Sequence, residues 1–123
     1  MSYKALIIDD SQLMRKMVER SLRATGLDLE AVFQAGDGQQ GLDALNDQPV
    51  DLVLCDMNMP NMNGLEFVKL TGDMSDRPLI VMVTTEGADS PGVSGALAAG
   101  AQGHLKKPFK VDEFEEKVRP LLE

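Results

Sequence analysis

The chain has 123 residues, of which 43% are hydrophobic and 26% are charged, and this composition is typical of one folded globular domain rather than a disordered chain. Twenty acidic residues against twelve basic ones give a formal net charge of −8. Because this charge would repel a phosphate backbone, we expect no direct binding to nucleic acid.

The first apolar segment, Ala5–Ile8, ends at Asp9 and Asp10. It is too short for a signal sequence or a membrane-spanning helix, so we expect a cytoplasmic protein without membrane insertion. The single Cys55 cannot form an intramolecular disulfide and follows another apolar run. We interpret it as a core residue without a chemical role.

Short apolar segments with β character alternate with longer segments whose apolar residues recur every three or four positions, which is typical of βαβ units. Almost continuously apolar strands indicate a parallel sheet covered by helices on both faces, with right-handed crossovers. The predicted strands are Ala5–Ile8, Ala31–Phe33, Leu52–Cys55, Leu79–Val83 and Gly103–Leu105.

Helices are predicted in the intervening segments. The first has an apolar face opposite a basic face and ends before Gly26. The second follows Gly36-Asp37-Gly38, the third begins near Gly64, and the last contains Pro120 in its final turn. The residues predicted to face inward on these four helices are Leu13, Met14, Met17, Val18 and Leu22; Leu42 and Leu45; Leu65 and Val68; and Val111, Phe114, Val118 and Leu121.

The remaining helix, between the fourth and fifth strands, begins with Ser90 and Pro91, which are favourable for the cap and the first helical position. Gly92 and Gly95 lie inside it, and each interior glycine costs about 1 kcal/mol relative to alanine. Two interpretations stay open. The small residues let the helix pack closely on a neighbour, or the helix is marginally stable and moves.

Polar residues follow four of the five predicted strands. The carboxyl ends of parallel strands lie at one edge of the sheet, so these side chains are expected to converge there. Ligands of such folds bind at this edge. Three carboxylates close together need a cation to stay ionised, and Mg²⁺ is the natural candidate because it prefers oxygen ligands. The residues at these strand ends are Asp9 and Asp10, Asp56, Thr84, and the pair Lys107-Pro108.

With these spacings the chain resembles response-regulator receiver domains, in particular the single-domain, CheY-like members of that family. The resemblance spans essentially the whole chain and implies a flavodoxin-like α/β fold with a five-stranded parallel sheet in the order 2-1-3-4-5. It also implies one receiver domain over residues 1–123 with no output domain. The motifs that carry it are Asp9-Asp10, the stretch from Asp56 to Gly64, Val83-Thr84, and Lys107-Pro108-Phe109.

The resemblance implies a stand-alone two-component response regulator rather than an enzyme with its own substrate. Asp56 would accept a phosphoryl group from a histidine kinase or a phosphotransfer protein, and the phosphorylated form would bind a downstream protein target. Self-catalysed phosphorylation and dephosphorylation would require Mg²⁺. An alternative within the family is a phosphorelay intermediate or phosphate sink that has no output target of its own.

The same resemblance assigns roles to individual residues. Asp10, Asp56 and the backbone carbonyl of Asn58 would ligate Mg²⁺, and Asp9 would act mainly through a bound water. Lys107 would pair with the Asp56 carboxylate or with the phosphoryl oxygens. The added phosphoryl oxygens need new donors, which the Thr84 hydroxyl and nearby backbone N–H groups can supply.

Thr84 and the position of His104 on the fifth strand are the expected switch residues. The family has an aromatic side chain where this chain has His104, and an imidazole is smaller than a phenol ring and can carry charge near neutral pH. We expect output through the fourth helix, the fifth strand and the fifth helix, with His104 tuning it; the alternative is that His104 is simply a partly exposed strand residue.

The resemblance makes three smaller predictions about this region. The peptide bond before Pro108 is expected to be cis. Asn58 and Glu86 would flank the phosphoryl site, as in regulators with a short-lived acyl phosphate. Thr85 stands where a smaller residue is common and can narrow access, so the lifetime stays open.

The basic face of the first helix comprises Arg15, Lys16, Arg20 and Arg23. It is either an ordinary solvated surface or a docking site for the phosphodonor protein.

Three other classes of protein fit less well. A phosphohydrolase of the haloacid-dehalogenase type needs a second aspartate two positions after the nucleophile, where this chain has Asn58. A flavodoxin needs a Ser/Thr/Gly-rich loop after the first strand and aromatic residues around the flavin, whereas this chain has Asp9-Asp10-Ser11-Gln12 there and no tryptophan. A P-loop nucleotidase is excluded because the chain has no G-x-x-x-x-G-K-[ST] sequence.

Overall fold

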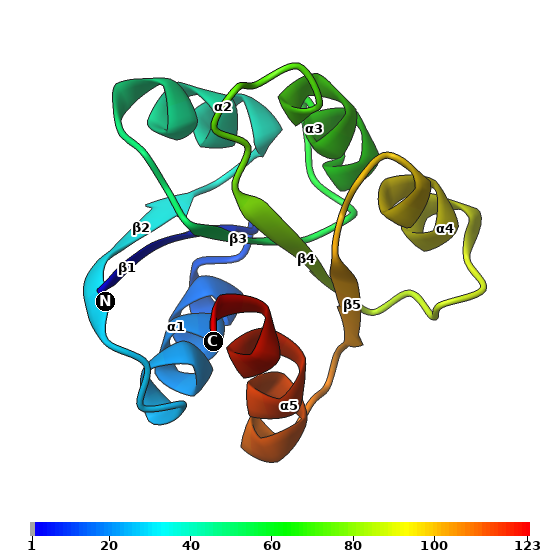
Figure 1. The fold of residues 1–123 in the computed structure, drawn as a ribbon. Helices are drawn as coiled ribbons and strands as arrows, with labels where there is room; N and C mark the ends of the chain where they lie inside the picture. The colour runs from blue at the N-terminus through cyan, green and yellow to red at the C-terminus, as the bar shows by residue number, and fades with distance from the viewer. Residues whose placement is uncertain (1) are drawn as a thin grey trace.

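The computed structural model describes residues 2–123 and contains a parallel sheet between two layers of helices (Figure 1). The strands pair in the order β2-β1-β3-β4-β5, so the predicted fold and strand order are confirmed. The elements are β1 (Tyr3–Ile8), α1 (Gln12–Ala24), β2 (Leu29–Ala35), α2 (Gly38–Asp47), β3 (Leu52–Cys55), α3 (Gly64–Thr71), β4 (Leu79–Thr84), α4 (Pro91–Ala98), β5 (Gly103–Lys106) and α5 (Val111–Leu122).

The helices are divided between the two faces of the sheet: α2, α3 and α4 cover one face, and α1 and α5 cover the other (Figure 1). Each layer closes over its own hydrophobic cluster. Phe67 of α3 is fully buried in the first cluster, and Phe114 of α5 is fully buried in the second. The sheet is therefore apolar on both faces, as its sequence pattern predicted.

The predicted strands are all present, and β3 has the predicted limits. The prediction was too short for β2, which extends from Leu29 to Ala35 instead of covering only residues 31–33. This strand lies at the edge of the sheet, where Glu30 and Gln34 face solvent. An exposed edge strand needs no continuous apolar run, so only its apolar centre stands out in the sequence.

The apolar face predicted for α1 is only partly correct. Val18 and Leu22 are buried and Met14 packs against the same cluster, but Leu13 is 70% exposed and Met17 is 48% exposed. A helix lying on a sheet buries a narrow stripe, and these two residues lie beyond its edge. Val111 on α5 was also predicted to face inward and is 44% exposed.

Helix α4 begins as predicted, with Ser90 as its cap and Pro91 in its first turn. The Ser90 hydroxyl accepts a hydrogen bond from the Val93 backbone N–H at 3.1 Å. A methyl group added to Gly95 would lie 3.2 Å from the Leu65 side chain of α3. This close approach favours the interpretation that the small residues of α4 allow tight packing against its neighbour.

Within residues 2–123, none of the helices is both long enough and apolar enough to cross a membrane.

Candidate functional site

The carboxyl ends of β1 and β3 bring three aspartates together. Ile8 and Cys55 are paired residues of these strands, and the Asp56 backbone N–H donates to the Ile8 carbonyl at 2.9 Å. One carboxylate oxygen from each of Asp9, Asp10 and Asp56 lies within 4.8 Å of the other two. The acidic cluster predicted from the strand ends is therefore present.

The Asp56 side chain is 12% exposed. Its Oδ1 atom accepts a hydrogen bond from the Met57 backbone N–H at 2.8 Å. Behind it, the Gly64 backbone N–H donates to the Met57 carbonyl at 2.8 Å. A side chain on Gly64 would collide with the Asp56 carbonyl oxygen, so the loop after β3 can close only with glycine there.

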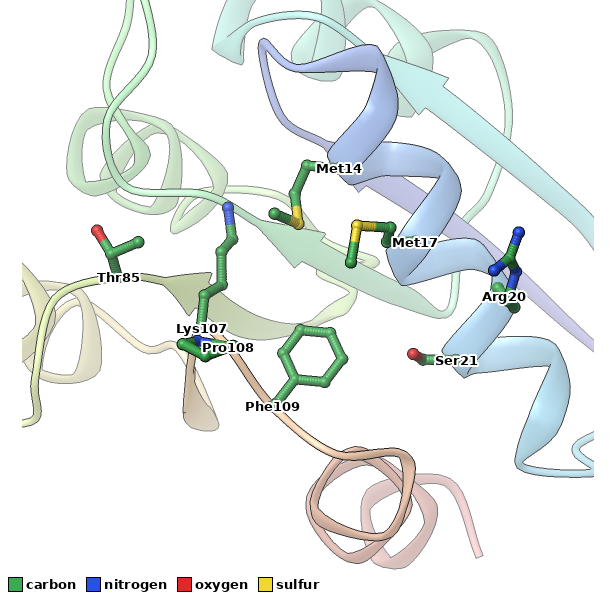
Figure 2. A pocket seen from close by; sticks show the side chains of 8 residues that line it. All are labelled: Met14, Met17, Arg20, Ser21, Thr85, Lys107, Pro108 and Phe109. Carbon is green, nitrogen blue, oxygen red and sulfur yellow. The ribbon is translucent and has the colours of Figure 1, made fainter.

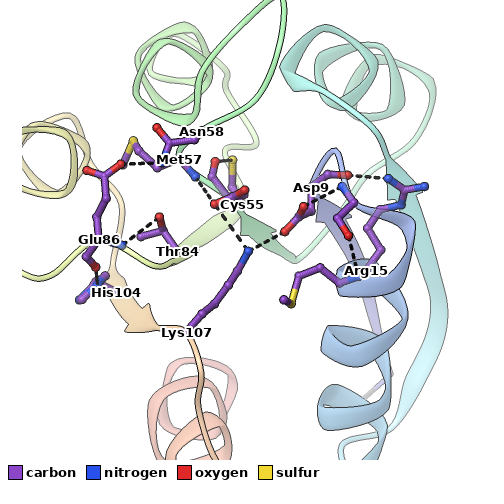
Figure 3. Close-up of polar contacts among 12 residues, drawn as sticks. Asp9, Arg15, Cys55, Met57, Asn58, Thr84, Glu86, His104 and Lys107 are labelled. Atoms are coloured by element: carbon purple, nitrogen blue, oxygen red, sulfur yellow. Dashed lines mark hydrogen bonds and ion pairs between the residues drawn. The ribbon is translucent and has the colours of Figure 1, made fainter.

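Lys107 reaches the acidic cluster from the end of β5. Its Nζ atom lies 2.8 Å from Asp9 Oδ2 and 3.7 Å from Asp56 Oδ1 (Figure 3). The expected partner of Lys107 was Asp56, and the shorter of the two ion pairs is with Asp9. The peptide bond between Lys107 and Pro108 is cis, as predicted.

Burial raises the pKa of Asp56 above its ordinary value. The Lys107 ammonium opposes this rise, and the charges of Asp9 and Asp10 add to it. The three carboxylates also outnumber the one lysine that pairs with them. A site with three converging carboxylates and too little positive charge fits a hard divalent cation such as Mg²⁺, which takes oxygen ligands.

Cys55 lies directly before Asp56 and is fully buried. Burial, followed by the nearby charges of Asp56 and Asp9, raises the pKa of its thiol. A thiol that stays protonated in this way is a poor nucleophile. The interpretation of Cys55 as a core residue is confirmed.

Thr84 and Asn58 both contact Glu86, which stands in the loop between β4 and α4. Thr84 is fully buried, and its hydroxyl accepts a long hydrogen bond of 3.4 Å from the Glu86 backbone N–H. The Asn58 side-chain amide donates to the Glu86 carboxylate at 2.9 Å. His104 Nε2 contacts the Glu86 carbonyl oxygen at 2.9 Å (Figure 3). The sequence identified Glu86 as a flanking residue but gave no sign of these three contacts.

The basic face of α1 divides into two parts. Arg15 is partly buried, and its guanidinium donates to the Asp9 carbonyl and to Gln34 Oε1, so it supports the site from behind. This role was missed because it depends on the packing of α1 against β2. Lys16 and Arg20 are exposed.

A cavity of about 380 Å³ lies between α1 and the loop after β5 (Figure 2). Its wall is mainly apolar, and Lys107 forms its border with the acidic cluster. Sequence analysis did not predict it, because its two walls are more than 60 residues apart in the chain. The lining residues are Met14, Met17, Arg20, Ser21, Thr85, Lys107, Pro108 and Phe109.

A parallel α/β sheet with an acidic cluster and a lysine at its carboxyl edge defines a receiver-type signalling domain. The chain belongs to the response regulator receiver domain family, whose model matches residues 5–119.

The relatives include chemotaxis regulators. A chemotaxis protein CheY homolog from Campylobacter jejuni is 37% identical over 123 residues, covering 97% of this chain and 92% of the relative. The structure of CheY4 from Vibrio cholerae has a TM-score of 0.86 at 34% identity and covers 99% of this chain and 100% of that chain. The response regulator domain of Thermotoga maritima CheB has a TM-score of 0.87 at 25% identity, covering 98% and 96% of the two chains.

Proposed function

We propose that the chain is a two-component response regulator that accepts a phosphoryl group on Asp56 and signals by phosphorylation-dependent protein binding. The observation that carries this proposal is the position of the Asp56 carboxylate, at the end of a buried strand, with Asp9, Asp10 and Lys107 around it. The family and its chemotaxis relatives support the same function.

In the transfer step, an Asp56 carboxylate oxygen forms a bond to phosphorus. The bond from phosphorus to the donor's histidine nitrogen breaks, and that nitrogen leaves with the electron pair. The product is an acyl phosphate, and hydrolysis by water returns the carboxylate and releases inorganic phosphate. Asp56 is suited to the attack because its partners hold the carboxylate in place before the donor arrives.

Asp10, Asp56 and the Asn58 carbonyl are the residues that would hold Mg²⁺, with Asp9 acting through a water. The ion would supply positive charge for the phosphoryl oxygens. Three carboxylates, one divalent ion and one lysine sum to zero charge, so a phosphoryl group needs further donors. The Thr84 hydroxyl and nearby backbone N–H groups would provide them.

The phosphodonor, a histidine kinase or a phosphotransfer protein, would dock on α1. Leu13 and Met17 expose apolar surface there, and Lys16 and Arg20 add positive charge to an otherwise acidic protein. The cavity between α1 and Phe109 continues this surface to Lys107. Output would pass through the β4–α4 loop, α4, β5 and α5, where Thr84 and His104 lie. A cytoplasmic location fits these partners and stays a prediction.

The function is tested by incubating the protein with acetyl phosphate and Mg²⁺ and measuring intact mass. We expect one added phosphoryl group that hydroxylamine removes, as an acyl phosphate requires. The modification should disappear in D56N and in the presence of EDTA. A phosphoryl group that persists in D56N, or no modification of the wild-type protein by any donor, would overturn the proposal.

The docking surface is tested with a phosphorylated histidine donor protein. The double variant K16E/R20E should slow transfer roughly tenfold, because charge complementarity mainly raises the association rate. Phosphorylation by acetyl phosphate should stay unchanged. The control is K69E, which reverses one exposed lysine on α3, on the opposite face of the sheet. Equal transfer rates for the double variant and the control would contradict docking on α1.

A further inference from the structure

The cavity between α1 and the loop after β5 is apolar along its length and carries one sign of charge. Its volume is about 380 Å³. Among the described residues that line it, only Arg20 and Lys107 are ionisable, and both are basic in a chain with a net charge of −8. Figure 2 shows Lys107 at one end and Arg20 at the other, with Met17 and Phe109 between them. An apolar cavity with a few polar groups is the usual form of a small-molecule site.

The two cations differ in their availability to a ligand. The Lys107 ammonium pairs with Asp9 at 2.8 Å, so its charge already has a partner. Arg20 is exposed, and its guanidinium forms no ion pair within the part of the chain that the structure describes. By contrast, Arg23 on the same helix pairs with Glu19 at 2.9 Å. Arg20 is thus the cation of this wall that can bind an added anion.

A second polar group reaches the cavity from the same helix. Ser21 is only 8% exposed and lines the cavity next to Arg20. Its hydroxyl forms no hydrogen bond with any described residue, and Figure 2 shows it on the side of the Phe109 ring. A nearly buried hydroxyl without a partner gains from a ligand that accepts its proton. Because guanidinium and hydroxyl groups are both donors, the ligand group that suits them is a negatively charged acceptor.

We propose that this cavity binds a small aromatic carboxylate. The carboxylate would accept hydrogen bonds from the Arg20 guanidinium, whose planar fork matches two carboxylate oxygens, and from the Ser21 hydroxyl. The aromatic body would lie against the Met14 and Met17 thioethers and the Phe109 ring.

The walls limit the size and shape of this ligand. A dry cavity of about 150 Å³ holds one benzene ring, so this one has room for a body of about two rings. The Phe109 ring packs on Phe114 with 5.4 Å between the ring centroids, so one wall is formed before a ligand arrives. The opposite wall is adaptable, because methionine side chains fill irregular shapes.

A ligand bound here would cover part of the α1 surface on which the phosphodonor is proposed to dock. It would slow transfer from a phosphorylated donor protein and leave Asp56 open to acetyl phosphate. This consequence rests on the proposed function, whereas the binding itself does not.

The binding is tested by titrating the protein with naphthoate and following the NMR signals of the methionine methyl groups. We expect the Met14 and Met17 signals to shift with a dissociation constant below about 1 mM. The signal of Met74, which follows α3, should stay in place. R20Q should weaken binding roughly tenfold, because a charge-assisted pair is lost. The matched control is R23Q, which removes the same charge from α1 outside the cavity and should bind as the wild type does.

A neutral analogue separates the charge of the ligand from its apolar body. Naphthalenemethanol should bind the wild-type protein about tenfold more weakly than naphthoate does, and R20Q should bind the two alike. S21A should weaken the binding of naphthoate roughly threefold, as the loss of one hydrogen bond predicts.

Equal affinities of R20Q and R23Q for naphthoate, or of the wild type for the acid and the alcohol, would overturn the proposal. The cavity would then select apolar surface alone, as a side chain of a docking protein provides. Shifts of Met74 as large as those of Met14 and Met17 would overturn it too, because they would indicate nonspecific binding.

The consequence for signalling is measured with a phosphorylated histidine donor protein. Naphthoate at ten times its dissociation constant should slow transfer about tenfold, and the rate with acetyl phosphate should stay unchanged. Unchanged transfer would overturn the competition. If the protein accepts no phosphoryl group from any donor, the proposed function fails, and the titration still decides whether the cavity binds the carboxylate.

Discussion

Asp56 combines two requirements that oppose each other: a nucleophile must be ionised, and a buried carboxylate resists ionisation. Burial raises its pKa, and Lys107 lowers it only in part. The folded protein binds a proton at Asp56 more tightly than the unfolded chain does. Protonation of Asp56 therefore stabilises the fold, and this stabilisation is fully present below the pKa of an unfolded aspartate. It is lost as the pH rises above the pKa of an unfolded aspartate.

D56N should therefore stabilise the protein at pH 7. Asparagine removes the buried charge and its repulsion from Asp9 and Asp10, which together outweigh the attraction to Lys107. A gain on the order of 1 kcal/mol in the free energy of unfolding is expected. Urea unfolding at pH 7 and pH 3.5 measures it. The difference between D56N and the wild type should shrink at the lower pH. A gain that is independent of pH would show that charge is not its cause.

At the scale of the elements, Asp37 joins α2 to the loop between β3 and α3. One carboxylate oxygen accepts the Gln40 backbone N–H at 2.8 Å and caps the helix, and the other accepts the Asn61 side-chain amide at 2.9 Å. Asn61 has a left-handed backbone with φ of 68°, which asparagine tolerates better than most residues. Asp37 thus fixes the far side of the loop that begins at Asp56.

D37A should lower the free energy of unfolding by about 1 kcal/mol, the usual cost of losing a helix cap. The Gln40 N–H and then the Asn61 amide lower the pKa of Asp37, so its contribution is present above the pKa of an unfolded aspartate. It is lost as the pH falls through the lower, folded value. Urea unfolding between pH 2.5 and pH 5 should show this loss in the wild type and not in D37N, which keeps the cap but has no charge.

Arg77 makes a similar connection between α3 and α4. Its guanidinium donates to the carbonyls of Val68 and Ala99 at 3.0 Å and 2.9 Å, at the carboxyl-terminal ends of the two helices. Charge-assisted bonds of this kind satisfy carbonyls that a helix end leaves without partners. The small residues of α4 and Arg77 together hold this helix against its neighbour.

The sequence predicted the elements whose pattern is local and repeated. The buried strand before Asp56 and the meeting of Asp9 and Asp56 at one edge follow from the apolar pattern and the parallel topology. The cap at Ser90 follows from the preference of serine and proline for the start of a helix. The exposure of Leu13 did not follow, because it depends on the width of the stripe that α1 buries. The contacts of Glu86 could not be predicted either. They depend on the conformation of a loop, and a loop has no periodic sequence pattern.

For the whole molecule, a net charge of −8 and a cluster of three aspartates make cation binding a source of stability. Mg²⁺ at a hundredfold excess over its dissociation constant should stabilise the fold by about 2.7 kcal/mol if it binds only the folded state. Thermal unfolding with and without Mg²⁺ measures this. D10N should abolish most of the gain, and D73N, which removes an exposed acid beyond the end of α3, should keep it. An equal gain in both variants would indicate nonspecific screening.

The short strand β3 has hydrogen-bonded neighbours on both sides, and its four residues are at most 1% exposed. Its backbone amides should therefore be among the slowest in the protein to exchange with deuterium, since they open only when most of the fold opens. The acceptor is thus anchored to the part of the chain least able to move. Beryllofluoride, which mimics a phosphoryl group, should leave exchange in β3 unchanged and slow it in the loop around Glu86. Faster exchange in β3 would show that the strand preceding Asp56 opens more readily when the phosphoryl mimic is bound.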